Sequence, residues 1–174
     1  MDCVVRFPAK WIDSAAFEIA LRSSTGPHAP GITSIGLEFP TGCKLMVDGA
    51  IRVLSLANQL AFATKRVRLN FEAGEDGTMG YLNRMGFFDH LDQRVEVLPR
   101  RPMFSGAMIH RGGNSMLVEI ARISSTQRDE GLPTRLSQAI TKACAGRPDI
   151  DELSGATWMI FAELIDNIFS HSAT

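Results

Sequence analysis

Residues 49–64 are apolar around most of the circumference of the helix that their spacing predicts. Asp48, directly before them, is a residue type typical of a helix N-cap. A helix with such a wide apolar surface is buried on several sides, or covers a sheet while it meets another partner. The apolar positions that give this pattern are Ile51, Val53, Leu54, Leu56, Leu60, Ala61 and Phe62.

A strand pattern follows this helix almost at once. In residues 66–71, Val67, Leu69 and Phe71 alternate with polar residues, which predicts a half-buried strand. Strands and helices interleave along the chain, so the sequence predicts a mixed fold, α/β or α+β, with no visible internal repeat. Further strands are expected at 2–7, 37–39, 44–47 and 94–98, and further helices at 12–22, 79–85, 133–145 and 153–172.

The composition excludes several classes of protein. Of 174 residues, 45% are hydrophobic and 21% are charged, which is typical of a globular chain and not of a disordered one. The net charge of −1 gives no indication of a nucleic-acid partner. The three cysteines are far apart, so we expect reduced thiols in a cytoplasmic protein. No run of eighteen apolar residues occurs, so no membrane partner is expected.

Two segments in the second half of the chain indicate where one domain ends and the next begins. Residues 104–110 and 115–123 flank Arg111-Gly112-Gly113-Asn114, a pattern that predicts a β-hairpin. The polar residues that follow are the best linker candidate. We therefore expect one domain over 1–124 and a second over 125–174.

The last helix carries the side chains with the clearest chemical potential. On a helical wheel, Glu163, Asn167 and His171 are spaced i, i+4, i+8 and form one ridge, beside Asp166 and Ser170. The Asn oxygen is a hard ligand that suits Mg²⁺, and a Glu can deprotonate a water. The alternative is an ordinary solvated helix face. The opposite face, which we expect to be buried, holds Trp158, Phe161, Leu164, Ile165, Ile168 and Phe169.

The residues Ala162-Glu163-Leu164-Ile165-Asp166-Asn167, followed by Ser170-His171-Ser172, resemble the N-box of GHKL-type ATPases. This superfamily includes gyrase B, sensor histidine kinases and anti-sigma-factor kinases. The resemblance implies that Asn167 coordinates Mg²⁺ at the phosphates of ATP. It implies that Glu163 is the general base and that His171 lies near the phosphates.

The chain departs from the family pattern at two points. Ile168 follows the Asn where the family usually has a small residue, and no Asp-x-Gly-x-Gly box occurs in the chain. The resemblance therefore implies the first helices of a GHKL α/β sandwich, truncated before its adenine-binding wall. We expect the parent to be an ATPase or a protein kinase with ATP and Mg²⁺ as cofactors, and the isolated segment to be inactive.

The first 124 residues resemble a STAS-like module through their order of short strands and helices and the segment 80–88. Such modules precede histidine-kinase-like ATPases in some bacterial proteins and serve in signalling as partner-binding or ligand-sensing parts. The resemblance makes Thr78 the nearest candidate for a phosphorylated residue, whereas its position also suits a helix cap. Arg100 and Arg101, between two prolines, are expected to lie in a solvated loop.

An alternative interpretation of the sequence involves no nucleotide binding. The chain is then a regulatory protein-interaction module, and its last helix is a packing or dimerisation surface. Its apolar face would favour a protein partner or a homodimer.

Overall fold

The computed structural model describes residues 2–110, 118–123 and 129–171. The chain forms two compact units, Met1–Ile109 (unit 1) and His110–Thr174 (unit 2). Unit 1 combines a parallel sheet with helices, and unit 2 contains a pair of helices. The expected mixed α/β class, in the α+β sense, is confirmed.

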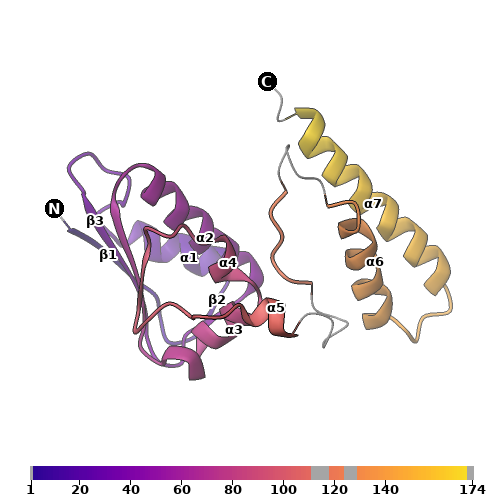
Figure 1. Ribbon diagram of the computed structural model, residues 1–174, viewed down its shortest axis with the longest axis horizontal. Helices are drawn as coiled ribbons and strands as arrows, with labels where there is room; N and C mark the ends of the chain where they lie inside the picture. Colours follow the sequence, from indigo (N-terminus) through magenta and orange to yellow (C-terminus); the bar gives the residue numbers. More distant parts are fainter. Residues whose placement is uncertain (1, 111–117, 124–128, 172–174) are drawn as a thin grey trace. The chain divides into compact units, whose positions relative to one another are not determined.

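The sheet of unit 1 has four parallel strands that lie side by side in chain order. Helices cover one face of the sheet (Figure 1), so every second strand residue is buried and the residues between them are exposed or partly exposed. The strands are β1 (Asp2–Arg6), β3 (Ser34–Phe39), β5 (Arg66–Phe71) and β6 (Glu96–Leu98). The helices are α1 (Ser14–Arg22), α2 (Val47–Phe62), α3 (Thr78–Arg84) and α4 (Phe87–His90).

The first three strands repeat at a fixed interval. Asp2 pairs with Ser34, and Ser34 pairs with Arg66, so the register advances by 32 residues at each step. Three phenylalanines at the same interval stack on one another, with ring centroids 4.8 Å apart for Phe7–Phe39 and 4.6 Å apart for Phe39–Phe71. The expectation of no internal repeat is therefore wrong at the level of structure. The repeat is hard to see in the sequence because the connecting segments have few identical residues besides Phe7-Pro8 and Phe39-Pro40.

Helix α2 is the apolar helix of the sequence analysis, and it begins two residues earlier than expected. Asp48 is not its N-cap, because α2 begins at Val47 and Met46 holds the cap position. The Asp48 carboxylate instead accepts the backbone N–H of Ser14 at the start of α1 (2.7 Å). This bond lowers the pKa of Asp48. The close approach of α2 needs Gly49, where an added Cβ would lie 2.5 Å from the Ile12 carbonyl oxygen.

A small second sheet extends unit 1 beyond the carboxyl ends of β1 and β3. It pairs β2 (Trp11–Ile12) with β4 (Lys44–Leu45) in parallel. After β5 the chain forms one 3₁₀ turn, η1 (Gly74–Asp76). Gly86, expected to end the helix over 79–85, has the left-handed φ of 79° that favours glycine there.

The strand expected at 104–110 is wrong. This segment holds a short helix, α5 (Gly106–His110), whose start is fixed by two polar side chains. Ser105 Oγ accepts the backbone N–H of Met108 (3.1 Å), and Asn83 Oδ1 accepts that of Gly106 (3.0 Å). Residues 118–123 have no regular secondary structure, and the turn expected at 111–114 lies outside the described residues.

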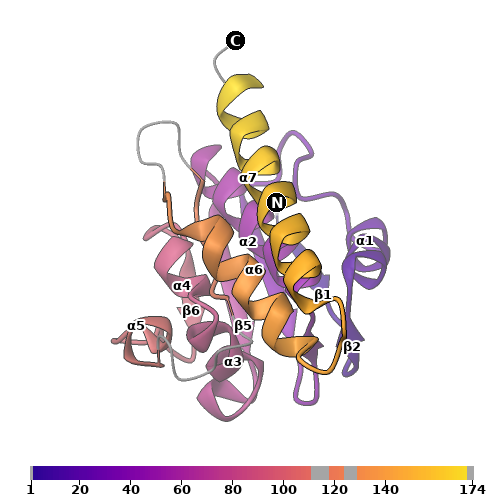
Figure 2. The ribbon, with the colours of Figure 1, turned by 90° about the vertical axis from the view of Figure 1, so that its right-hand side faces the viewer.

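Unit 2 contains two helices joined by a short turn, which lie side by side (Figure 2). They are α6 (Leu132–Ala143), with Pro133 in its first turn as expected, and α7 (Ile150–His171). The last helix begins three residues earlier than its apolar pattern predicts. Arg147 and Asp149 form an ion pair of 2.6 Å in the turn before it.

Candidate functional site

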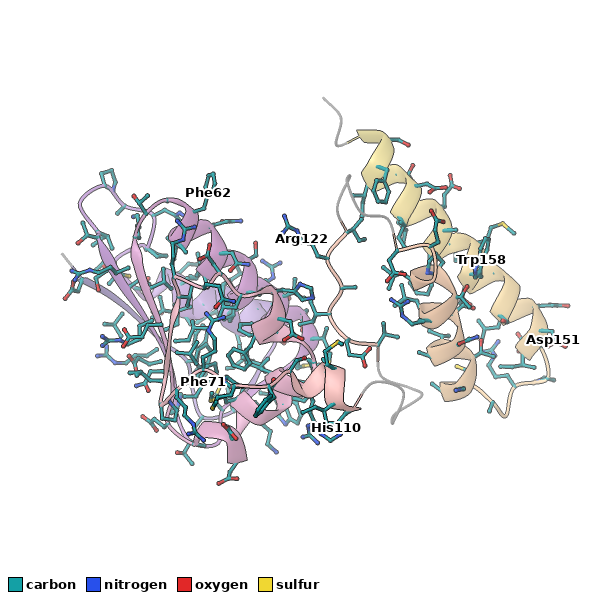
Figure 3. All side chains as sticks on the ribbon, viewed as in Figure 1. Phe62, Phe71, His110, Arg122, Asp151 and Trp158 are labelled. Atoms are coloured by element: carbon teal, nitrogen blue, oxygen red, sulfur yellow. The ribbon has the colours of Figure 1, made fainter. Side chains whose placement is uncertain are left out.

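The candidate site lies on α7, which hydrogen bonds anchor to α6 at its N-terminal half. Ser137 Oγ donates to the carbonyl of Ser154 (2.9 Å) and lies 2.9 Å from the Thr157 hydroxyl. Trp158 Nε1 donates to Thr134 Oγ1 (3.1 Å), and Figure 3 shows the indole where α7 meets α6. Ser137 is almost fully buried, so this small polar network fixes the register between the helices.

The apolar anchor of α7 is narrower than the sequence predicts. Ile165 is only 5% exposed, whereas Trp158 is half-exposed and Phe161 is partly exposed. Leu164 and Ile168, expected in the buried face, are also about half exposed. The helical wheel groups all apolar positions of α7 into one buried face. A single neighbouring helix, however, covers only about a third of the circumference of α7.

The polar ridge is where the sequence predicts it. Glu163 and Asn167 are exposed, and four residues separate them, so they lie on the same side of α7 one turn apart. Within the part of the chain that the structure describes, no hydrogen bond or ion pair engages either side chain. Their oxygens are therefore open to a ligand or to solvent.

The neighbours of this pair are less available. Ser170 Oγ donates to the carbonyl of Asp166 in the same helix (2.9 Å), so its proton is engaged. His171 ends α7, and its side chain lies outside the described residues. The structure therefore brings Glu163 and Asn167 together, and the role expected of His171 stays a prediction.

A second ridge on α7 was not anticipated. Ile160, Leu164 and Ile168 are spaced i, i+4, i+8 like the polar ridge, and each is about half exposed. Their positions in the 3.6-residue period place this apolar ridge beside Asn167 and away from Ile165. The sequence already indicated this second ridge, because the apolar residues occupy more of the surface of α7 than one neighbouring helix can bury.

The polar ridge suits a magnesium–phosphate group better than a metal held by protein alone. Among the described residues, no group of three or more His, Cys, Asp or Glu side chains could hold a metal ion. Mg²⁺ differs from most protein-bound metals, because it keeps several waters and is held by one or two protein oxygens together with substrate phosphates. Asn167 and Glu163 fit that mode of binding.

Two expectations for unit 1 are tested by its hydrogen bonds. The Thr78 hydroxyl donates to the carbonyl of Cys43 and does not cap α3, so its proton is committed to the neighbouring loop. The solvated loop expected at Arg100 and Arg101 is wrong for Arg101. Its guanidinium donates to the carbonyls of Leu91 (3.1 Å), Asp92 (2.7 Å) and Val95 (2.9 Å).

Unit 1 also has a cavity that the sequence analysis missed. It has a volume of about 620 Å³ and lies beyond the carboxyl ends of β3 and β5. Its wall is formed by Trp11, residues 41–47, Ala73, residues 76–78 and Tyr81. The available signal was the pair of glycine-containing turns that follow parallel strands, the usual position of ligand sites in α/β sheets.

Comparison of the chain with protein-family models, with curated proteins and with solved structures finds no match. None of the helices in the described part of the chain combines the length and the apolar character that a membrane span requires.

Proposed function

We propose that this chain is part of a bacterial signalling protein that binds ATP and Mg²⁺ through a GHKL-type domain. In this proposal α6 and α7 belong to the ATP-binding domain, and unit 1 is a STAS-like regulatory module. Asn167 supplies an oxygen ligand to Mg²⁺ at the nucleotide phosphates, and Glu163 polarises the attacking water or hydroxyl. The parent protein is then an ATPase or a protein kinase.

The observation that supports this proposal most is the pairing of two ridges on α7. The free carboxylate and carboxamide of Glu163 and Asn167 lie beside the uncovered apolar ridge of Ile160, Leu164 and Ile168. An exposed apolar ridge of this kind is suited to packing against a further helix or sheet. The polar ridge beside it would then border that contact. This is the position in which a helix presents side chains to a ligand.

The proposal can be tested on this chain by titrating ¹⁵N-labelled protein with Mg-ATP. We expect weak binding that shifts the backbone signals of residues 163–167 and the side-chain amide of Asn167. Asn167→Ala should abolish these shifts, since the metal then loses its protein oxygen. Glu163→Ala should leave them largely intact, and Glu152→Ala, an exposed carboxylate in the first turn of the same helix, is the matched control. Shifts that avoid α7, or that survive Asn167→Ala, contradict the proposal.

The roles separate further in a protein that carries the helix pair α6–α7 within a complete nucleotide-binding domain. Asn167→Ala should weaken nucleotide binding itself. Glu163→Ala should retain binding and slow turnover by about a hundredfold or more, because a general base contributes roughly 10²–10⁴ in rate. Nucleotide titration and steady-state turnover of both variants make the comparison. Wild-type affinity and turnover in both would leave the polar ridge as a solvated helix face.

The apolar ridge also favours a second candidate, in which the chain is an interaction module that associates with a second copy through α7. Sedimentation velocity distinguishes this function. Leu164→Glu should convert a dimer to a monomer, whereas Met159→Glu, an exposed apolar position off the ridge, should not. A wild-type chain that stays monomeric at high concentration excludes this candidate.

A further inference from the structure

The cavity of unit 1 has the size and lining of a small-molecule site. Its volume of about 620 Å³ falls in the range of roughly 300–1,000 Å³ found for ligand pockets. Trp11 and Tyr81 contribute aromatic rings, and Leu45, Met46 and Val47 contribute aliphatic side chains and a thioether. Flat rings and an adaptable Met side chain together favour a planar apolar ligand.

Three of the apolar side chains around this cavity are accessible, whereas Leu45 behind them is buried. Trp11 is 62% exposed, and Met46 and Val47 are about half exposed, although all three line one cavity. A side chain such as Trp11 would gain free energy from being covered. A cluster of accessible apolar groups around a concave surface is typical of a binding site, whereas scattered apolar residues are not.

The walls of the cavity are held in place without a ligand. The Thr78 hydroxyl, at the start of α3, donates to the carbonyl of Cys43 in the loop after β3. On the same two segments, the Glu72 carboxylate accepts the backbone N–H of Thr41 (3.0 Å). These bonds connect the loops after β3 and β5, so the cavity is preformed and binding orders little additional chain.

The polar groups in the wall indicate the charge of the ligand. Lys44 and Asp76 provide one cation and one anion, and the Lys44 ammonium lies 5.2 Å from the centroid of the Trp11 ring. The two charges balance, so the wall selects for neither sign. The Tyr81 hydroxyl has no hydrogen-bond partner in the described part of the chain, so it is free to donate to or accept from a ligand.

We infer that unit 1 binds an uncharged, planar aromatic small molecule in this cavity, with a hydrogen-bonding group directed at Tyr81. The site lies in unit 1 and does not depend on nucleotide binding at α7. Binding of such a molecule would make unit 1 a sensor of small aromatic compounds.

The chain contains two tryptophans, which allows a direct test. In Trp158→Phe, Trp11 is the single tryptophan, and the uncharged fluorophore N-phenyl-1-naphthylamine is the probe. We expect energy transfer from Trp11 to the probe that saturates at one probe per chain. Transfer that rises without saturation overturns the inference, since it reports only adsorption to apolar surface.

Variants then locate the site, all built on Trp158→Phe. Val47→Phe fills the cavity and should weaken probe binding by at least about tenfold. Ile51→Phe is the matched control, since it lies one turn along α2 at similar exposure and outside the cavity, and it should keep wild-type affinity. Thr41→Phe, which fills the cavity from the preceding turn, repeats the test if Val47→Phe does not fold.

Two further measurements complete the test. Leu164→Glu places a charge in the middle of the apolar ridge of α7 and should leave the energy transfer unchanged. Tyr81→Phe should weaken binding of 2-naphthol, which carries a hydroxyl, more than that of naphthalene, which does not. Wild-type probe affinity in both cavity-filling variants, or loss of binding in Leu164→Glu, overturns the inference.

Discussion

At the residue scale, Arg101 differs most from its sequence-based interpretation. Two arginines between prolines look alike in the sequence, but Arg100 is exposed and Arg101 is partly buried. The Arg101 guanidinium joins the end of α4 to the segment before β6 through backbone carbonyls alone. No local pattern could distinguish the two residues, because the acceptors of Arg101 are backbone groups brought together by folding.

Arg101→Ala should therefore destabilise unit 1 by about 2–4 kcal/mol, because several buried carbonyls lose a charged donor. Arg100→Ala should change the stability by less than about 0.5 kcal/mol, as expected of an exposed side chain. Urea unfolding followed by far-ultraviolet circular dichroism measures both. Equal effects of the two substitutions would show that the carbonyls find water instead.

The thiols provide a second prediction at this scale. Burial raises the pKa of Cys43 to about 11, whereas Cys144 is partly exposed. Iodoacetamide at pH 8 should therefore modify Cys144 well before Cys43, as read by peptide mass spectrometry. Because the folded-state pKa of Cys43 lies above that of the unfolded chain, its neutral form stabilises the fold below about pH 9. This contribution should be lost as pH rises towards 11, and Cys43→Ser should weaken that dependence.

At the scale of elements, α7 shows that periodicity predicts a helix but not which of its apolar residues are buried. Its existence follows from its apolar repeat, and its polar ridge lies on the predicted side. Which apolar side chains are covered does not follow, since this depends on the width of α6. Ile165 and Leu164 are adjacent in sequence and both apolar, yet one is buried and the other is half exposed.

Ile165→Ala should accordingly cost about 2–4 kcal/mol, the usual effect of removing buried methyl groups. Leu164→Ala removes a similar volume from an exposed site and should cost less than about 1 kcal/mol. The fluorescence of Trp158, in a Trp11→Phe background, reports the unfolding of this helix pair in urea. A larger effect at Leu164 than at Ile165 would mean that the apolar ridge of α7 is covered in solution.

For the elements of unit 1, prediction succeeds where the pattern is long. Strand β5 has the predicted bounds, and α2 is displaced by two residues. Prediction fails at α5, because a five-residue helix has too few positions to show a period and its start depends on Asn83, which is distant in sequence. The candidate residues on α7 follow from spacing, whereas the cavity requires the loops after β3 and β5 to be adjacent.

At the scale of the whole molecule, the chain should bind Mg-ATP only weakly. Glu163 and Asn167 are exposed and do not line the cavity described for unit 1. A nucleotide held by its metal and phosphates alone leaves its base in water. We therefore expect a dissociation constant above about 10 μM, equivalent to less than roughly 7 kcal/mol of binding free energy. Isothermal titration measures it, and tighter binding would require a base-binding surface elsewhere in the chain.

The order of the strands in unit 1 affects how the chain can fold during synthesis. Each strand of the four-stranded sheet pairs with the strand that precedes it in the sheet, and none inserts between strands already paired. The N-terminal part of such a sheet can therefore form on the ribosome before the C-terminal part has been translated. Every later strand then joins an existing edge of the sheet. Phe39 stacks on Phe7 when β3 joins β1, and Phe71 stacks on Phe39 when β5 joins β3.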